Sequence, residues 1–313
     1  MRTVKGITAL ALIAAFAAAC SSGAASPSAA PSAAPSAAPS AAPSASPDAC
    51  AKDNLTTRTA GKLTIGTDNP AYPPYFDPPA SGETATDPWE LGDPTNGRGF
   101  ESAVAYAVAG KLGFAKGDVA WTYIPFDNSY APGDKTFDFD INQVSYTAAR
   151  AQGVDMSDGY YTVNQALVAN KGTPITKVTT IAGLAAFKLG AQQGTTSYQF
   201  IADSIKPTTE ASVYDSNDAA IAALNAKQID GIVVDLPTAF YITAAQMDNG
   251  VIVGQFPAPT GADAEHFSLV LQKSSTLTPC VNAAIAALKA DGTLDSITKE
   301  WLSDKASAPV FQP

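Results

Sequence analysis

Histidine and cysteine are scarce in this chain of 313 residues, which contains one histidine, His266, and three cysteines. Metal sites draw mainly on these two residue types at short spacings, and no such spacing occurs, so we predict no metal site. A Ser-His-Asp catalytic set would have to use His266, and the sequence shows no glycine loop of the nucleotide-binding kind. We therefore expect no cofactor.

Positive charge is also scarce. The 19 lysines and arginines are outnumbered by 29 aspartates and glutamates, which gives a formal net charge of −10. After the first residues, the arginines are Arg58, Arg98 and Arg150. Proteins that bind nucleic acid present a basic stripe or patch. The composition therefore argues against a nucleic-acid partner.

The first residues have the pattern of an export leader. Arg2 and Lys5 precede an apolar run that is too short to span a bilayer comfortably and that ends in Ala-Ala-Ala-Cys. This pattern predicts a lipoprotein signal peptide over residues 1–19, with Cys20 as the lipidated first residue of the mature protein. An ordinary signal peptide cut elsewhere is the alternative. We expect a protein outside the cytoplasm, lipid-anchored to the outer face of the cell membrane.

A tether and a folded head follow the leader. Residues 20–49 are almost entirely Ser, Ala and Pro, with proline at every fourth position, a composition that favours an extended chain over a packed core. Residues 50–313 are long enough for two lobes, each with an apolar core. They contain two cysteines, Cys50 and Cys280, which predict a disulfide in an exported protein. Two buried free thiols are the alternative.

Strand and helix patterns alternate along the head. Residues 62–68 alternate between apolar and polar, which predicts a strand, and apolar residues recur every four positions in 100–112, which predicts a helix. Further strands are predicted at 119–126 and 137–144. This order favours an α/β lobe rich in parallel strands. The loop at 77–97 is long, and it either covers a ligand cleft or is a surface excursion.

A second set of alternating elements follows. It comprises strands at 188–193, 229–235 and 251–256 and a helix at 197–205. Ser216 is the predicted N-cap of the next helix, and Pro237 falls in the first turn of another. Thr278 is predicted to cap a helix that ends at Gly292, and a last helix follows.

Two short apolar strands, at 165–171 and 266–273, separate the two sets, so we predict two lobes with the first completed by the C-terminal segment. We expect hinges within 166–169 and 268–271. The predicted boundaries are 50–167 plus 268–313 for the first lobe and 168–267 for the second.

One hydroxyl-rich turn has the outline of an anion site. The turn Ser145-Tyr146-Thr147 follows a buried strand, and Arg150 lies three residues further on. Hydroxyls, free N–H groups and a planar guanidinium fork together match a carboxylate. A surface arginine paired with a neighbouring acid is the alternative.

Two features of the second set fit the same ligand chemistry. In Gly194-Thr-Thr-Ser197 a strand ends and a helix begins, so Thr195 and Thr196 can direct N–H groups and hydroxyls at an anion; an ordinary helix cap is the alternative. Asp235 ends an apolar strand, where its carboxylate needs a cationic or N–H partner, and a cap of the following helix could also satisfy it.

The turn at 145–150 and the apolar-Asp-apolar-Ser run at 154–157 resemble the bacterial extracellular solute-binding proteins of the polar amino-acid family. Further motifs match in the family's order: TIGTDNPAYPPYF, GFESAVAYAVAGKLGF, YYTVNQALVANKG, LGAQQGTTS, AALNAKQIDGIVVDLPTAFY and FSLVLQKSSTLTPCVNAAIAALKADGTLDSITKEWL. The resemblance covers residues 60–303. It implies a two-lobed, hinged, periplasmic-binding-protein-like (type II) α/β fold.

The resemblance also implies roles for individual residues. Ser145 and Arg150 correspond to the clamp on an amino acid's α-carboxylate, and Thr147 to a residue that holds the turn. Thr195 and Thr196 would close on that carboxylate from the second lobe, and Asp235 would bind the α-ammonium. There are three more candidates. Tyr72 matches an aromatic that stacks on the ligand, and Asp68 matches an acid that contacts polar side chains of the ligand. The third is Gln143, whose long side chain departs from the family pattern.

These features together predict the substrate-binding subunit of an ABC importer. It would capture an amino acid, of polar type, and present the closed form to a membrane permease and its ATPase subunits; we expect a monomer. One alternative is an exported dehydratase of the same fold that acts on a cyclic amino-acid precursor, with Asp68 and either Asp127 or Glu101 as acid and base. A ligand-sensing binding module is another.

Overall fold

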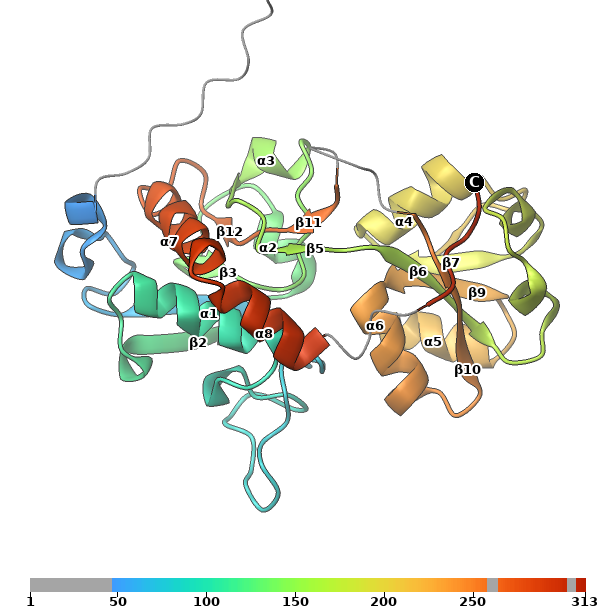
Figure 1. Ribbon diagram of the computed structural model, residues 1–313, viewed down its shortest axis with the longest axis horizontal. Helices are drawn as coiled ribbons and strands as arrows, with labels where there is room; N and C mark the ends of the chain where they lie inside the picture. Colours follow the sequence, from blue (N-terminus) through green and yellow to red (C-terminus); the bar gives the residue numbers. More distant parts are fainter. Residues whose placement is uncertain (1–46, 258–263, 303–307) are drawn as a thin grey trace, which may run out of the picture. The chain divides into compact units, whose positions relative to one another are not determined.

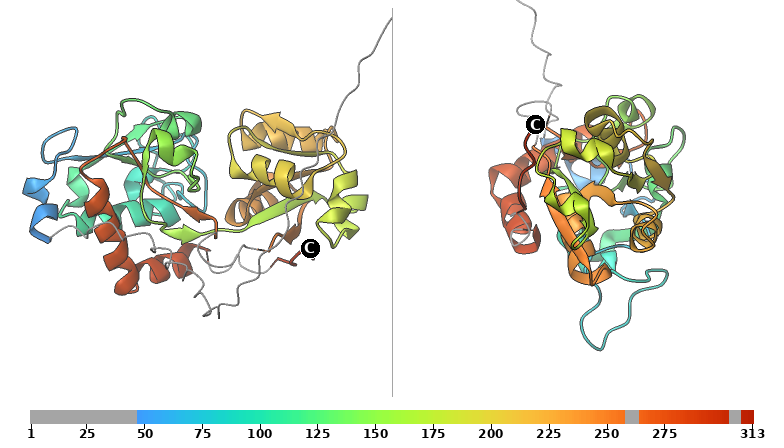
Figure 2. Two further views of the ribbon diagram at one scale, coloured as in Figure 1. Left: turned by 90° about the horizontal axis from the view of Figure 1, so that it is seen from above. Right: turned by 90° about the vertical axis from the view of Figure 1, so that its right-hand side faces the viewer.

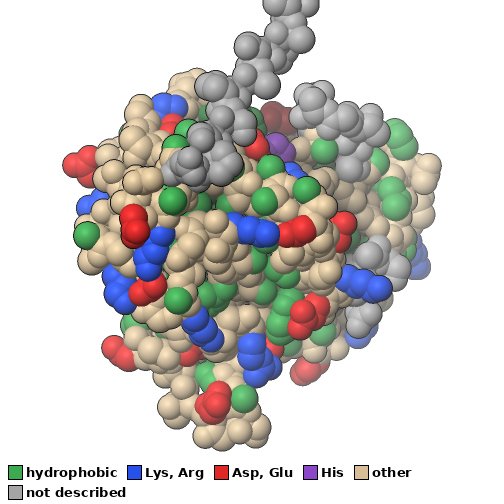
Figure 3. Space-filling view, turned by 60° about the vertical axis from the view of Figure 1, so that its left-hand side comes forward, with side chains coloured by type: hydrophobic (Ala, Val, Ile, Leu, Met, Phe, Trp, Pro, Cys, Tyr) green, Lys and Arg blue, Asp and Glu red, His purple; other side chains and the backbone are tan. Residues whose placement is uncertain are grey.

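The computed structural model describes residues 47–257, 264–302 and 308–313 (Figure 1). The predicted signal peptide, Cys20 and nearly all of the predicted tether lie outside these residues. Within the described ranges, no helix is both long and apolar enough to cross a membrane. On the face drawn in Figure 3, lysine and arginine side chains are interspersed with aspartates and glutamates.

The first lobe is built on a five-stranded sheet of order β2-β1-β3-β12-β4. β1 runs parallel to β2 and β3, whereas β12 runs antiparallel to β3 and β4. The predicted alternation in the first strand reflects burial, because Leu63 and Ile65 of β1 are fully buried. The strands are β1 (Leu63–Thr67), β2 (Val119–Tyr123), β3 (Phe139–Asp140), β4 (Asp155–Met156) and β12 (Val270–Leu271).

Helices cover this sheet, and three of them, α1, α7 and α8, pack against one another (Figure 1). The predicted disulfide is present: Cys50 is bonded to Cys280 of α7. Trp89 is buried in the core of this lobe, so the loop at 77–97 is folded onto it. The helices are α1 (Phe100–Lys111), α2 (Phe126–Tyr130), α3 (Arg150–Gly153), α7 (Thr278–Ala290) and α8 (Thr293–Leu302).

The second lobe has its own five-stranded sheet, of order β10-β6-β9-β7-β8. β6 runs antiparallel to β10 and β9, and β7 runs parallel to β9 and β8. Its strands are β6 (Gln165–Asn170), β7 (Leu189–Gln192), β8 (Ser212–Tyr214), β9 (Gly231–Asp235) and β10 (Gly250–Gln255). Its helices are α4 (Thr196–Phe200), α5 (Asn217–Asn225) and α6 (Leu236–Tyr241), with α4 and α6 each continued by one π-type turn. The two-lobed α/β prediction is confirmed.

The crossings between lobes differ from the prediction. Residues 166–169 lie within β6, which is hydrogen-bonded on both sides inside the second sheet, and Leu269 and Leu271 are buried in the first core. The residues predicted as hinges, 166–169 and 268–271, therefore lie inside the lobes and not between them. The chain instead changes lobe next to a short antiparallel pair, β5 (Tyr161–Thr162) with β11 (His266–Phe267).

The C-terminal segment corrects the predicted lobe boundary. The first-lobe core includes Leu302, but Phe311 is buried in the second-lobe core, with its ring centroid 4.9 Å from that of Phe256. Val310 pairs with Gln255, and Figure 2 marks the C-terminus on the second lobe. The assignment of 268–313 to the first lobe therefore fails for 308–313, because this aromatic fills the core beside β10.

Two local predictions also need correction. The strand predicted at 119–126 ends at Tyr123, and Phe126 begins α2 after Pro125. Thr278 is the first residue of α7 and makes no cap; its hydroxyl instead donates to Asp155 Oδ2 at 2.9 Å. By contrast, Ser216 Oγ accepts the Ala219 N–H at 3.2 Å and caps α5 as predicted.

Candidate functional site

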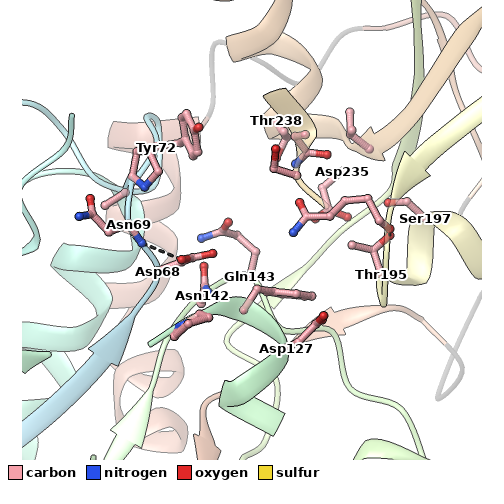
Figure 4. A pocket seen from close by; sticks show the side chains of 18 of the residues that line it. Asp68, Asn69, Tyr72, Asp127, Asn142, Gln143, Thr195, Ser197, Asp235 and Thr238 are labelled. Carbon is pink, nitrogen blue, oxygen red and sulfur yellow. Dashed lines mark hydrogen bonds between the residues drawn. The ribbon is translucent and has the colours of Figure 1, made fainter. Parts of the chain in front are cut away.

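A cleft with a volume of about 350 Å³ is lined by residues of both lobes (Figure 4). Its wall includes all eight residues predicted to contact a ligand: Asp68, Tyr72, Gln143, Ser145, Arg150, Thr195, Thr196 and Asp235. They meet because most of them follow the carboxyl ends of strands, which share one edge of each sheet. That these residues bind a ligand remains a prediction.

Arg150 begins α3 and is held by contacts from both lobes. Its backbone N–H donates to Thr147 Oγ1 at 3.1 Å, so Thr147 holds the turn as expected. Its guanidinium donates to the Ser145 carbonyl at 2.6 Å and to the Gly194 carbonyl of the second lobe at 2.8 Å. The guanidinium carbon also lies 4.3 Å from the ring centroid of Tyr130.

This environment decides between the two interpretations of Arg150. The residue is only 9% exposed, and its described partners are carbonyls and an aromatic face. The alternative of a surface arginine paired with a neighbouring acid is therefore wrong. Burial lowers the pKa of Arg150 from its usual value, while nearby Tyr130, Asp235 and Glu265 oppose that shift.

Two hydroxyls of the predicted anion clamp meet one glutamate. Ser145 Oγ donates to Glu265 Oε1 at 2.7 Å, and Thr196 Oγ1 donates to the same oxygen at 2.5 Å. Ser145 belongs to the first lobe and Thr196 to the second, so one carboxylate oxygen joins the lobes. Sequence reasoning missed Glu265, which lies just before the crossing strand β11 with no motif around it.

The two threonines of the second lobe have different roles. Thr195 is the N-cap of α4: its Oγ1 accepts the Tyr198 N–H at 3.2 Å and donates to the Gln192 carbonyl at 2.7 Å. The cap alternative therefore holds for Thr195, although the residue still lines the cleft. Thr196, one residue on, has its hydroxyl directed to Glu265.

Asp235 is partly buried at the end of β9 and makes no side-chain cap of α6. Its Oδ1 accepts a hydrogen bond from Gln165 Nε2 at 2.7 Å, and the same amide lies 3.2 Å from Glu265 Oε2. Burial raises the pKa of Asp235 well above its usual value, and the charge of Glu265 adds to that rise. A cation in the cleft would favour the ionised form of Asp235.

The cleft is acidic. Four of its lining residues are carboxylic acids, namely Asp68, Asp127, Asp215 and Asp235, and one of its described lining residues, Arg150, is basic. Asp68 Oδ1 accepts the Asn69 N–H at 2.8 Å, and burial raises the pKa of Asp68. A ligand with more positive than negative groups is therefore favoured.

Tyr72 joins the two lobes at the edge of the cleft. Its hydroxyl donates to Asp218 Oδ2 of the second lobe at 2.5 Å, and its ring centroid lies 6.2 Å from that of Tyr241. Tyr75 is buried in the first core, with its hydroxyl 3.1 Å from Thr238 Oγ1. The prediction that Tyr72 stacks on a ligand remains open to test.

Gln143 is held by hydrogen bonds to a buried acid, Glu101. Its φ of +48° is in the left-handed region, and both its backbone N–H and its side-chain amide donate to Glu101. Glu101 is fully buried, also accepts a hydrogen bond from Tyr160, and has its pKa raised to about 7 by burial. Glu101 is not among the residues that line the cleft, whereas Asp127 is.

The remaining predictions about the wall are settled by the same geometry. None of the described residues 77–97 lines the cleft, so that loop does not cover it. Sequence reasoning missed Asp215, Ser216 and Asn217, which line the cleft at the start of α5. Their signal was the predicted cap at Ser216, because helix starts in this fold point toward the same edge as the strand ends.

The chain is similar to known proteins. The model of the bacterial extracellular solute-binding proteins, family 3, matches residues 81–304. The chain is 26% identical over 244 residues to the ABC transporter arginine-binding protein 1 of Escherichia coli, covering 77% of this chain and 91% of that protein. It is 28% identical over 247 residues to the L-cystine-binding protein TcyJ of the same organism, covering 77% and 82%. A solved ancestral arginine-binding protein bound to glutamine is 26% identical, with a TM-score of 0.60, and the match covers 78% of this chain and 99% of that one.

Proposed function

Since this chain belongs to the bacterial extracellular solute-binding proteins of family 3, we propose that it captures an amino acid between its lobes as the substrate-binding subunit of an ABC importer. The observation that carries this proposal is the cleft, in which a buried arginine and a partly buried aspartate from opposite lobes face one cavity. Arg150 offers positive charge to an α-carboxylate, and Asp235 offers negative charge to an α-ammonium.

The acidic wall supports a ligand with a polar, positively charged side chain. After Asp235 is assigned to the α-ammonium, Asp68, Asp127 and Asp215 still line the cleft. Their charge favours a second cationic group on the ligand. Two relatives named above are arginine-binding proteins, and this agrees with that charge pattern.

The location and partners follow from the same proposal. Family members are extracytoplasmic binding proteins, and this chain would be held at the outer face of the cell membrane by a lipid on Cys20 and by the tether at 20–49. The monomeric head would present its closed form to a membrane permease whose ATPase subunits work in the cytoplasm. No catalytic step is part of the proposal.

A melting screen of the purified head against the common amino acids tests the proposal. Ligand at a hundred times its dissociation constant stabilises a protein by about 2.7 kcal/mol, which raises the melting temperature of a head of this size by roughly 5 to 10 °C. We expect L-arginine or L-lysine to give the largest shift. No shift with any amino acid, or turnover of a cyclic amino-acid precursor by the same sample, would contradict it.

A further inference from the structure

Glu265 accepts hydrogen bonds from the two hydroxyls that a ligand carboxylate would need. A carboxylate bound by the predicted clamp would accept hydrogen bonds from Ser145 and Thr196, and both hydroxyls already donate to Glu265 Oε1, at 2.7 and 2.5 Å. A hydroxyl has one proton to donate, so neither can serve Glu265 and a ligand at once. The clamp in this structure is bound to a carboxylate of the chain itself.

The guanidinium of the clamp is engaged in a different way. Arg150 donates to two backbone carbonyls, one from each lobe, and no described ion pair joins it to an acid. Five N–H donors are available on a guanidinium, so Arg150 keeps donors for a ligand while it holds the turn. Glu265 therefore competes for the hydroxyls rather than for a direct bond to Arg150.

Glu265 has a second partner to which it can turn. Gln165 Nε2 lies 3.3 and 3.2 Å from its two carboxylate oxygens. Gln165 itself is buried in β6 and also donates to Asp235. A small rotation of the Glu265 side chain toward Gln165 would free Ser145 and Thr196 without leaving the carboxylate unpaired, which limits the cost of displacement.

We propose that Glu265 is an internal competitor for the ligand's carboxylate and sets the affinity of the site by occupying the Ser145 and Thr196 hydroxyls until a ligand displaces it. The inference rests on the proposed function. It predicts that the chain binds amino acids more weakly than the same cleft would without Glu265. It also predicts that this effect is specific to ligands with a free carboxylate, because an uncharged carboxamide gains less from the freed hydroxyls.

Calorimetric titration of Glu265→Ala and Glu265→Gln with L-arginine and L-argininamide tests the inference. We expect Glu265→Ala to bind L-arginine about tenfold more tightly than the natural chain, and L-argininamide less than threefold more tightly. Glu265→Gln keeps a hydrogen-bond acceptor without the charge, so its affinity for L-arginine should fall between those of Glu265→Ala and the natural chain. Glu300→Ala removes the same charge from an exposed position on α8 and should leave both affinities unchanged. Melting curves show that each variant is folded.

Two results would overturn the inference. One is an L-arginine affinity in Glu265→Ala that is equal to or below that of the natural chain, as expected if Glu265 binds the ligand's ammonium. The other is an equal gain for L-arginine and L-argininamide, which would indicate a general charge effect.

Failure of the proposed function would appear differently, as no binding of any common amino acid by the natural chain or by any variant. Solution scattering without ligand then decides the inference, because Glu265 joins Ser145 of one lobe to Thr196 of the other. A larger radius of gyration in Glu265→Ala than in the natural chain supports it. Equal radii overturn it.

Discussion

The two lobes share one architectural plan but hold their chain ends differently. In the first lobe, the start of the described chain is fixed covalently, through the disulfide between Cys50 and Cys280 of α7. In the second lobe, the described chain end is held by packing and backbone hydrogen bonds, with Phe311 buried against Phe256 and Val310 paired with Gln255. The stability of each lobe can therefore be changed without touching the other, and without touching the cleft.

The lobes also differ in how they prepare the cleft. The first lobe supplies Arg150, fixed by a turn, two carbonyls and an aromatic ring. The second supplies Asp235, a partly buried acid that accepts a hydrogen bond from Gln165 and whose pKa is raised by desolvation. One side of the site is thus organised before a ligand arrives, whereas the other is completed by the charge that a ligand brings.

Removing the disulfide should have the largest effect. Replacing Cys50 and Cys280 with serine releases a loop with a sequence separation of 230 residues, for which chain entropy predicts a loss of about 5 kcal/mol. All three tryptophans of the chain pack in the first lobe, so their fluorescence reports that lobe. In urea, the fluorescence transition should move to lower denaturant. An unchanged transition would show that the covalent link does not stabilise the first lobe.

Removing the C-terminal aromatic tests the second lobe. Phe311→Ala deletes a buried ring and should lower the free energy of unfolding of this lobe by about 4 kcal/mol. Circular dichroism, which reports both lobes, should show an early transition that fluorescence does not follow. Gln312→Ala removes an exposed side chain from the next position and should change little. If the two variants behave alike, the segment at 308–313 does not support the second core.

How far sequence predicts this molecule depends on whether a residue belongs to a local pattern. β1, β9, the cap at Ser216 and the proline in the first turn of α6 were predictable because spacing and caps encode them. The cleft residues were predictable because turns after buried strands share one edge, and because of the family resemblance.

The missed features have no such pattern. Phe311 is a single aromatic in a short tail, and nothing near it in the sequence indicates a partner in β10. Glu265 reaches the clamp only because a crossing strand places it between two turns far apart in sequence. Glu101 was named from the sequence as a candidate acid or base, but its burial was missed, because it lies in the first turn of α1, where an exposed acid is ordinary. These three depend on long-range packing.

Glu101 gives a smaller, pH-dependent effect in the first lobe. Its pKa is raised from 4.5 to about 7, so the folded state binds its proton more tightly than the unfolded chain does. The stability that this proton contributes is present below pH 4.5 and is lost as the pH rises through 7. From pH 5 to pH 7 this group should lower the free energy of unfolding by about 2 kcal/mol.

Urea unfolding of Glu101→Gln followed by tryptophan fluorescence at pH 5 and pH 7 measures this contribution. Between pH 5 and pH 7, the free energy of unfolding should fall by about 2 kcal/mol less in the variant than in the natural chain, because glutamine does not titrate. The same pH dependence in both proteins would mean that Glu101 is ionised in the folded state at pH 5.

Titration of L-arginine into the natural chain, Arg150→Ala and Asp235→Asn tests the central claim most directly, because each variant removes one charge from one lobe. Arg98→Ala and Asp248→Asn remove the same charges from exposed positions. We expect both cleft variants to bind L-arginine at least thirtyfold more weakly, because losing one partner of a desolvated charge pair costs about 2 to 5 kcal/mol. Both control variants should bind L-arginine as the natural chain does. Unaltered affinity in both cleft variants would contradict recognition of an amino acid between Arg150 and Asp235.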